Sequence, residues 1–174
     1  MVRAVAIGGA VLATIACGLG TSVGAVAGPA PGATVYMFGS CYDPSQPLQA
    51  QPQRVVYGCD STSVMDNMTW SSWGADGATG TGTDNAVQCQ PNCAQGPHLY
   101  NPIVVHAWNP VPAGRPGCPD NAAFYTDFTV AYPAGVPPWV VPGTTWGPDV
   151  KYTYVDGMPA VHFFDQRPYS CTPL

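Results

Sequence analysis

Short runs of β-branched and aromatic residues, separated by glycine- and proline-rich turns, extend through the chain from residue 34 onward. Runs of this length and spacing are typical of short strands joined by tight connections. They predict strands at 34–38, 53–58, 63–73, 78–88, 101–108, 123–132, 150–155 and 159–164. We therefore expect an all-β fold, a small antiparallel β-sandwich of immunoglobulin-like or related type, with a small β-barrel as the alternative.

The charged residues of the chain support a β fold and exclude one class of partner. The chain contains no Glu and a single Lys, Lys151, so it lacks residues that commonly build exposed helices. All ten acidic residues are Asp, and the formal net charge is −5. There is no cluster of basic residues of the kind that binds nucleic acid or anionic lipid, so we expect no nucleic-acid partner.

The N-terminal segment has the pattern of a secretory signal peptide. One positive charge, Arg3, precedes an apolar run over residues 4–19, and Ala25-Val26-Ala27 fits a signal-peptidase site. The pattern predicts a signal over 1–27, a flexible lead-in over 28–33 and a single β domain over 34–174. We expect a secreted protein with no membrane insertion after cleavage. Attachment to the envelope through an uncleaved signal, or through a lipid on Cys17, is the alternative.

Six cysteines remain after such a cleavage, an even number that predicts three disulfides in an exported chain. Cys41–Cys59 is the favoured pair, while Cys89 and Cys93 either bridge to each other or reach outward to Cys59 and Cys118. A zinc site formed by Cys89, Cys93 and His98 is less favoured in an oxidising compartment, and we expect no metal and no cofactor. The full set is Cys41, Cys59, Cys89, Cys93, Cys118 and Cys171.

The first hairpin is predicted around a two-residue turn at Asp76-Gly77, where both residues need positive φ. This register places Trp73 opposite Gly80 and Trp70 opposite Thr83. Because side chains alternate between the faces of a strand, the two tryptophans are expected on opposite faces, with Trp73 covering strand glycines.

The second hairpin is predicted at Asp156-Gly157. Its register places Tyr152, Tyr154, Val161 and Phe163 on a core face and Lys151, Thr153, Ala160 and His162 on a solvated face. Pro159 donates no ladder hydrogen bond, so its strand is expected at a sheet edge.

Catalytic chemistry finds little support in the sequence. No Gly-x-Ser-x-Gly motif occurs, and a hydrolase would have to use His106 or His162 with an Asp. A histidine in a strand more often packs or lies at the surface than takes part in catalysis. Asp60, Asp66 and Asp84 are expected in turns, where Asp makes local hydrogen bonds.

Trp139 and Trp146 are the favoured candidates for binding. Both lie in a proline-rich connection, where surface exposure is expected and where aromatic rings contribute most to recognition. The partner expected there is an envelope polysaccharide or a protein.

Three motifs follow one another through the middle of the chain, and with them it resembles small exported proteins of mycobacteria and related actinobacteria. The likeness runs through about residues 55–132. It implies a bacterial source and assigns no catalytic residue. The motifs are Trp70-x2-Trp73-Gly74, Ala78-x-Gly80-x-Gly82 and Cys89-x-Pro91-x-Cys93-Ala94-x-Gly96.

The favoured function is that of a secreted, non-enzymatic binding module of the cell envelope or of host contact. A small secreted hydrolase and a purely structural envelope protein are the alternatives.

Overall fold

The computed structural model describes residues 32–168 and 170–172, and these residues fold into nine strands. The predicted signal over 1–27, its cleavage site and Cys17 lie outside the described residues. Within the described part, no helix is long and apolar enough to cross a membrane. The strands are β1 (Val35–Phe38), β2 (Val55–Gly58), β3 (Ser63–Gly74), β4 (Gly77–Val87), β5 (His98–Pro112), β6 (Ala122–Ala131), β7 (Thr145–Gly147), β8 (Val150–Val155) and β9 (Met158–Phe163).

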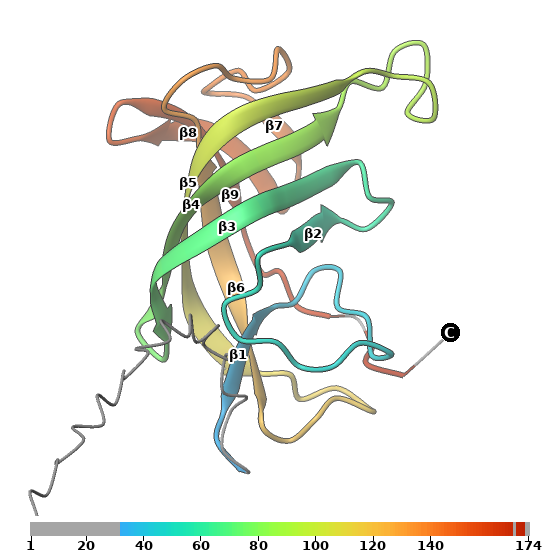
Figure 1. Cartoon of the computed structure of the whole chain (residues 1–174), viewed down its shortest axis with the longest axis vertical. Coiled ribbons are helices and arrows are strands. Elements are labelled where there is room, and N and C mark those ends of the chain that lie inside the picture. The colour runs from blue at the N-terminus through green and yellow to red at the C-terminus, as the bar shows by residue number, and fades with distance from the viewer. Residues whose placement is uncertain (1–31, 169, 173–174) are drawn as a thin grey trace, which may run out of the picture.

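All nine strands belong to one strongly curled sheet, a half-barrel, in which eight strands follow the order β2-β3-β4-β5-β6-β9-β8-β7. Figure 1 shows the strands curling into one curved sheet, and β2 and β7 are its two ends in the strand order. The remaining strand, β1, pairs in parallel with the first half of β6, while the second half of β6 pairs with β9. The prediction of a small, disulfide-stabilised, antiparallel all-β fold is confirmed, with the strands arranged in one curled sheet.

Near β1 the curl is closed by side chains. The hydroxyl of Tyr125 on β6 donates to the carbonyl of Gly74 at the end of β3 and accepts from the Gly74 N–H, both at 3.0 Å. Phe38 of β1 packs beside Trp70 and Trp73 of β3, with ring centroids 5.8 and 6.0 Å apart. These contacts join strands that share no backbone ladder, and they fill the concave face with aromatic rings.

Eight predicted strands exist, each within a few residues of the predicted bounds. The sequence missed β7, because its three residues lie in a connection dominated by proline and glycine, where no alternating pattern develops.

The first hairpin turns one step earlier than predicted. Gly74 pairs with Gly77, so Ala75 and Asp76 form the turn and both flanking glycines have positive φ. A β-bulge between Trp70 and Ser72 adds one residue to β3 and shifts the register.

This bulge also corrects the predicted faces of the tryptophans. The inserted residue brings Trp70 and Trp73 to the same face, where their rings lie 4.6 Å apart at 70°. It is Trp70, and not Trp73, that covers Gly80, and a Cβ added at Gly80 would lie 2.6 Å from the Trp70 ring.

The second hairpin turns at Asp156-Gly157 as predicted, and both residues have positive φ. Its faces are only partly as predicted, because Tyr154 is 63 % exposed and Ala160 is fully buried. β9 lies between β6 and β8 and is not an edge strand. Pro159 is tolerated there because it lies just past the last β6–β9 pair, where its carbonyl accepts from the Tyr132 N–H at 2.9 Å.

Three disulfides brace the connections outside the sheet. Cys41–Cys59 is confirmed, and Cys89 bridges locally to Cys93. Cys118–Cys171 joins chain segments 53 residues apart, with Cys171 buried in a small second core beside Phe124. Three such bonds are consistent with an extracellular or otherwise oxidising compartment.

Candidate functional site

A groove of about 850 Å³ lies where the curled sheet remains open. β2 and β7 share no ladder, and residues of both edge strands line the groove together with residues of β4, β8 and β9. Six aromatic residues contribute to its lining, and we call this feature the aromatic groove. The six are Tyr57, Tyr132, Trp139, Trp146, Tyr152 and Phe163.

The side chain of Tyr57 connects the edge strand β2 with the opposite part of the curled sheet. Its ring meets that of Phe163 on β9 at 5.5 Å and 78°, an edge-to-face contact. Phe163 in turn stacks on Phe128 of the core, with centroids 4.5 Å apart. The groove therefore has a wall of packed aromatic rings, and contact with the core residue Phe128 holds them in place.

Asp84 lies at the base of the groove and is completely buried. Tyr57 donates to its Oδ1 at 2.6 Å, and Tyr132 donates to its Oδ2 at 2.9 Å. Burial raises the pKa of the Asp84 carboxyl, while the hydrogen bonds from the two phenols act in the opposite direction. The pKa values of both tyrosines are also raised, mainly by burial.

Asp84 is the functional candidate that the sequence analysis missed. It had been expected in a turn, as had Asp66, but both lie within strands, while Asp60 does lie in a turn. A signal was present in the alternation of β4, because Ala78, Asp84 and Ala86 share one parity and are buried. An acid at a core-facing position of a strand is unusual and points to a specific role.

Both predicted binding residues line the aromatic groove. Trp146 lies on β7 and is 75 % exposed, whereas Trp139 is half-buried against the core. The groove thus contains one accessible indole ring, that of Trp146, and one that packing holds more firmly, that of Trp139. Their role in binding stays a prediction.

Two of the disulfides border the groove. Cys59 and Cys89 both line it; Cys59 is bonded to Cys41 on a neighbouring loop, and Cys89 to Cys93 within its own loop. The Gln88 N–H donates to the Pro97 carbonyl at 2.9 Å, which closes the base of the 89–96 loop. Because Cys89 and Cys93 are joined to each other, their sulfurs are not thiolates available to a metal.

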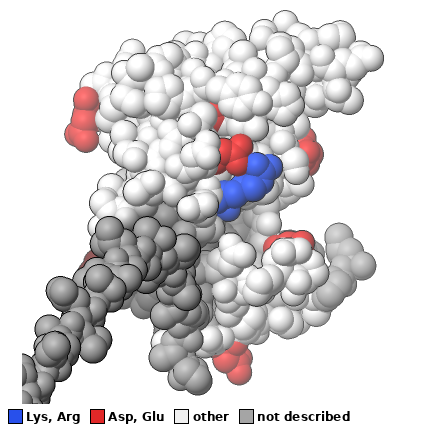
Figure 2. Space-filling view, viewed as in Figure 1, with Lys and Arg blue, Asp and Glu red and all other residues white. Residues whose placement is uncertain are grey.

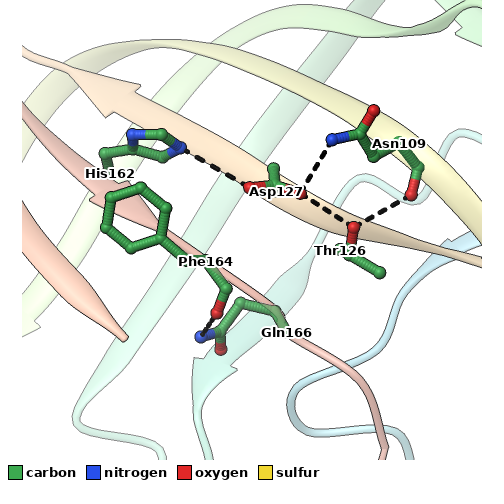
Figure 3. Close-up of polar contacts among 6 residues, drawn as sticks. All are labelled: Asn109, Thr126, Asp127, His162, Phe164 and Gln166. Atoms are coloured by element: carbon green, nitrogen blue, oxygen red, sulfur yellow. Dashed lines mark hydrogen bonds and ion pairs between the residues drawn. The ribbon is translucent and has the colours of Figure 1, made fainter. Parts of the chain in front are cut away.

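The histidines lie apart from the groove. Figure 3 shows His162 facing Asp127, whose other carboxylate oxygen accepts from Thr126 at 2.8 Å and from Asn109 at 3.1 Å. His162 Nε2 is 3.9 Å from Asp127 Oδ1, which is an ion-pair separation and too long for a hydrogen bond. Burial lowers the pKa of His162, and the Asp127 charge opposes this effect.

The other two histidines are exposed and lie beside aromatic rings. His106 stacks on Trp108 at 5.1 Å, and His98 Nδ1 lies 2.7 Å from the Asn85 side-chain oxygen. Among the described residues, therefore, no histidine makes hydrogen bonds to both a carboxylate and a hydroxyl.

Comparison of the chain with protein-family models, with curated proteins and with solved structures finds no match.

Proposed function

We propose that the protein is an extracellular binding protein that holds a small organic ligand, or an end group of a larger molecule, in the aromatic groove without chemical conversion. The observation that carries this proposal is the groove itself, which opens between the unpaired edges β2 and β7 and has six aromatic residues in its lining. Concave sites with apolar walls and a few fixed polar groups are typical of ligand binding.

The charge of the groove limits the ligand. Its charged lining residues are Asp60 and Asp84, and none of the described lining residues is Lys, Arg or His. The chain as a whole is acidic, and Figure 2 shows few charged side chains on the face that it presents. An anionic ligand would find no partner charge in the groove, so a neutral or cationic ligand is favoured.

The compartment we propose is outside the cytoplasm. The three disulfides, the predicted signal over 1–27 and the resemblance to exported mycobacterial proteins all support secretion. Mass spectrometry of the exported protein tests it: a mature N-terminus at Gly28 is expected, whereas lipid on Cys17 or an intact signal would show attachment to the envelope.

The hydrolase alternative has weaker support. The His162–Asp127 pair lies outside the groove, and the Thr126 hydroxyl makes its hydrogen bonds to Asp127 and to the Asn109 carbonyl. The Thr126 hydroxyl makes no hydrogen bond to His162, so this histidine is not placed to activate it as a nucleophile. A purely structural envelope role would leave the groove without a use.

A thermal-shift screen tests the binding function. Neutral oligosaccharides, short neutral peptides and organic ammonium ions are added to the wild type, to a W139A/W146A variant and to Tyr100→Ala. Tyr100 is 65 % exposed and outside the groove, so it controls for loss of any exposed ring. A ligand of the folded state raises Tm. We expect at least one class to raise the Tm of wild type and Y100A only; equal responses of all three proteins, or none, would refute the proposal.

A further inference from the structure

The least usual group in the aromatic groove is a buried carboxyl without a cation. Asp84 is 0 % exposed, and the ion pairs of the described residues, Arg54–Asp66, His162–Asp127 and Arg167–Asp165, do not include it. Buried charges in proteins are ordinarily paired with an opposite charge or with a metal. Here the carboxyl receives two phenolic hydrogen bonds and no positive charge.

The geometry points to an organic cation, an alkylammonium group of the quaternary type, as the ligand of the aromatic groove. This inference rests on the binding function proposed above and names its ligand class. Such a cation supplies the missing charge without needing hydrogen-bond acceptors of its own. It is also the class of ligand that protein sites enclose with aromatic rings.

The walls of the groove fit this ligand. The faces of aromatic rings carry negative partial charge and attract cations placed over them. Tyr57 and Phe163 both line the groove and meet at 78°, so the two rings present differently oriented surfaces to it. Trp139 and Trp146 line the same groove, and tryptophan is the strongest of the rings in this interaction.

Asp84 strengthens the attraction through the two tyrosines. Because Tyr57 and Tyr132 donate hydrogen bonds to the carboxylate, electron density in the two phenols shifts toward their oxygens and rings. The negative charge of Asp84 thus reaches the groove through the phenols, although the carboxyl itself is not exposed. Asp60, which is exposed and also lines the groove, adds a second negative charge.

Other ligand classes fit the same groove less well. A metal ion needs several converging oxygen, nitrogen or sulfur ligands, and the described residues contain no group of three His, Cys, Asp or Glu side chains arranged for one. An anion meets only negative charge. A neutral sugar would stack on the rings but would leave Asp84 uncompensated.

The test compares choline with 3,3-dimethylbutan-1-ol, which has the same shape and hydroxyl but no charge. Titration calorimetry and tryptophan fluorescence measure both on the intact, disulfide-bonded protein. We expect choline to bind at least tenfold more tightly than the alcohol. Phosphocholine, which represents a lipid headgroup, is expected to bind more weakly than choline because its phosphate meets Asp60 and no cation. Tighter binding of phosphocholine would identify a headgroup as the source of the ammonium group.

Variants locate the effect at the groove. Asp84→Asn retains the shape of the side chain and removes its charge, and it should weaken choline binding at least fivefold and binding of the alcohol by much less. Asp60→Asn offers a second variant at an exposed position, where the amide oxygen can still accept from Thr62, and a two- to threefold loss of choline affinity is expected. Asp76→Asn, in the turn of the first hairpin and outside the groove, should change nothing.

The outcomes separate this inference from the proposed function. Equal affinity for choline and its neutral isostere, or choline binding that neither Asp variant weakens, would overturn the cation assignment. In either case a ligand that depends on Trp139 and Trp146 would leave the binding function standing. Absence of any ligand with that dependence would refute both.

Discussion

Tyr57 on β2 and Asp84 on β4 are joined across the intervening strand β3 by a hydrogen bond of 2.6 Å. β2 has only four residues, and its ladder with β3 is interrupted between Val56 and Gly58. An edge strand this short has few backbone bonds to hold it. The phenol–carboxylate contact therefore serves as an anchor for the strand as well as part of the groove.

Replacing Tyr57 with Phe should destabilise the fold by about 1–3 kcal/mol, because the buried Asp84 oxygen loses its donor while the packing of the ring is retained. Unfolding in guanidinium chloride measures the effect. Tyr132→Phe should have a similar cost, since Tyr132 donates to the other oxygen. Tyr100→Phe, at an exposed position, is the control and should stay within about 0.5 kcal/mol of wild type. A Y57F variant as stable as Y100F would contradict the anchoring role.

Adding a methyl group beneath Trp70 should also be costly. A Cβ at Gly80 would lie 2.6 Å from the Trp70 ring and 2.9 Å from the Thr69 carbonyl oxygen, so Gly80→Ala forces ring and strand apart. We expect a loss of about 1–3 kcal/mol, which is usual for overpacking, together with a change in tryptophan fluorescence. Gly147→Ala is the matched control: a Cβ there meets nothing within 4 Å, and stability should be nearly unchanged. Equal stability of the two variants would show that Trp70 does not cover Gly80 in solution.

The tryptophan pair also shows where sequence reasoning on this fold fails. Strict alternation predicts that Trp70 and Trp73 face opposite ways, and it would be right for a regular strand. The bulge between Trp70 and Ser72 inverts the parity of every later residue in β3, and nothing in the local sequence Trp-Ser-Ser-Trp marks it. The bounds of the strands, in contrast, depend on turn residues and on runs of β-forming residues, and both can be recognised in the sequence.

The candidate site was predictable only in part, and for a similar reason. Trp139 and Trp146 were recognisable because an aromatic residue in a proline-rich connection is conspicuous by itself. The Tyr57–Asp84–Tyr132 group assembles side chains 27 and 48 residues apart, so only the curl of the sheet brings it together. Its one local trace is the parity of Asp84 in β4.

The three disulfides should differ in their contribution to stability. Loop-closure entropy predicts about 4 kcal/mol for the 53-residue separation of Cys118–Cys171 and about 2 kcal/mol for the four-residue separation of Cys89–Cys93. Paired Cys→Ser variants of each bond, compared by thermal unfolding, test this order. The C118S/C171S variant should lose more Tm, also because Cys171 is buried. A larger loss in C89S/C93S would mean that the loop beside the groove is held mainly by its own bridge.

The titration of Asp84 should lower the stability of the fold as pH rises. Since burial raises the pKa of the folded carboxyl above its ordinary value of 3.8, the folded state binds this proton more tightly than the unfolded chain does. The contribution of Asp84 to stability is therefore most favourable at low pH and is lost as pH rises from about 4 through the raised pKa. Asp84→Asn has no such titration, so its Tm relative to wild type should increase as pH rises from about 4 through the raised pKa and stay level above it.

Asp43→Asn supplies a control of opposite sign for this measurement. Hydrogen bonds from Ser45 lower the pKa of Asp43. The Tm of wild type relative to D43N should therefore rise as pH increases from the lowered pKa to about 4. Thermal unfolding of the three proteins from about pH 2 to 7 gives both differences, with the Asp43 difference developing below about pH 4 and the Asp84 difference above it. A D84N difference that is flat or falls with pH would show that Asp84 is already ionised without cost in the folded state. The base of the aromatic groove would then carry its charge without needing a ligand to compensate it.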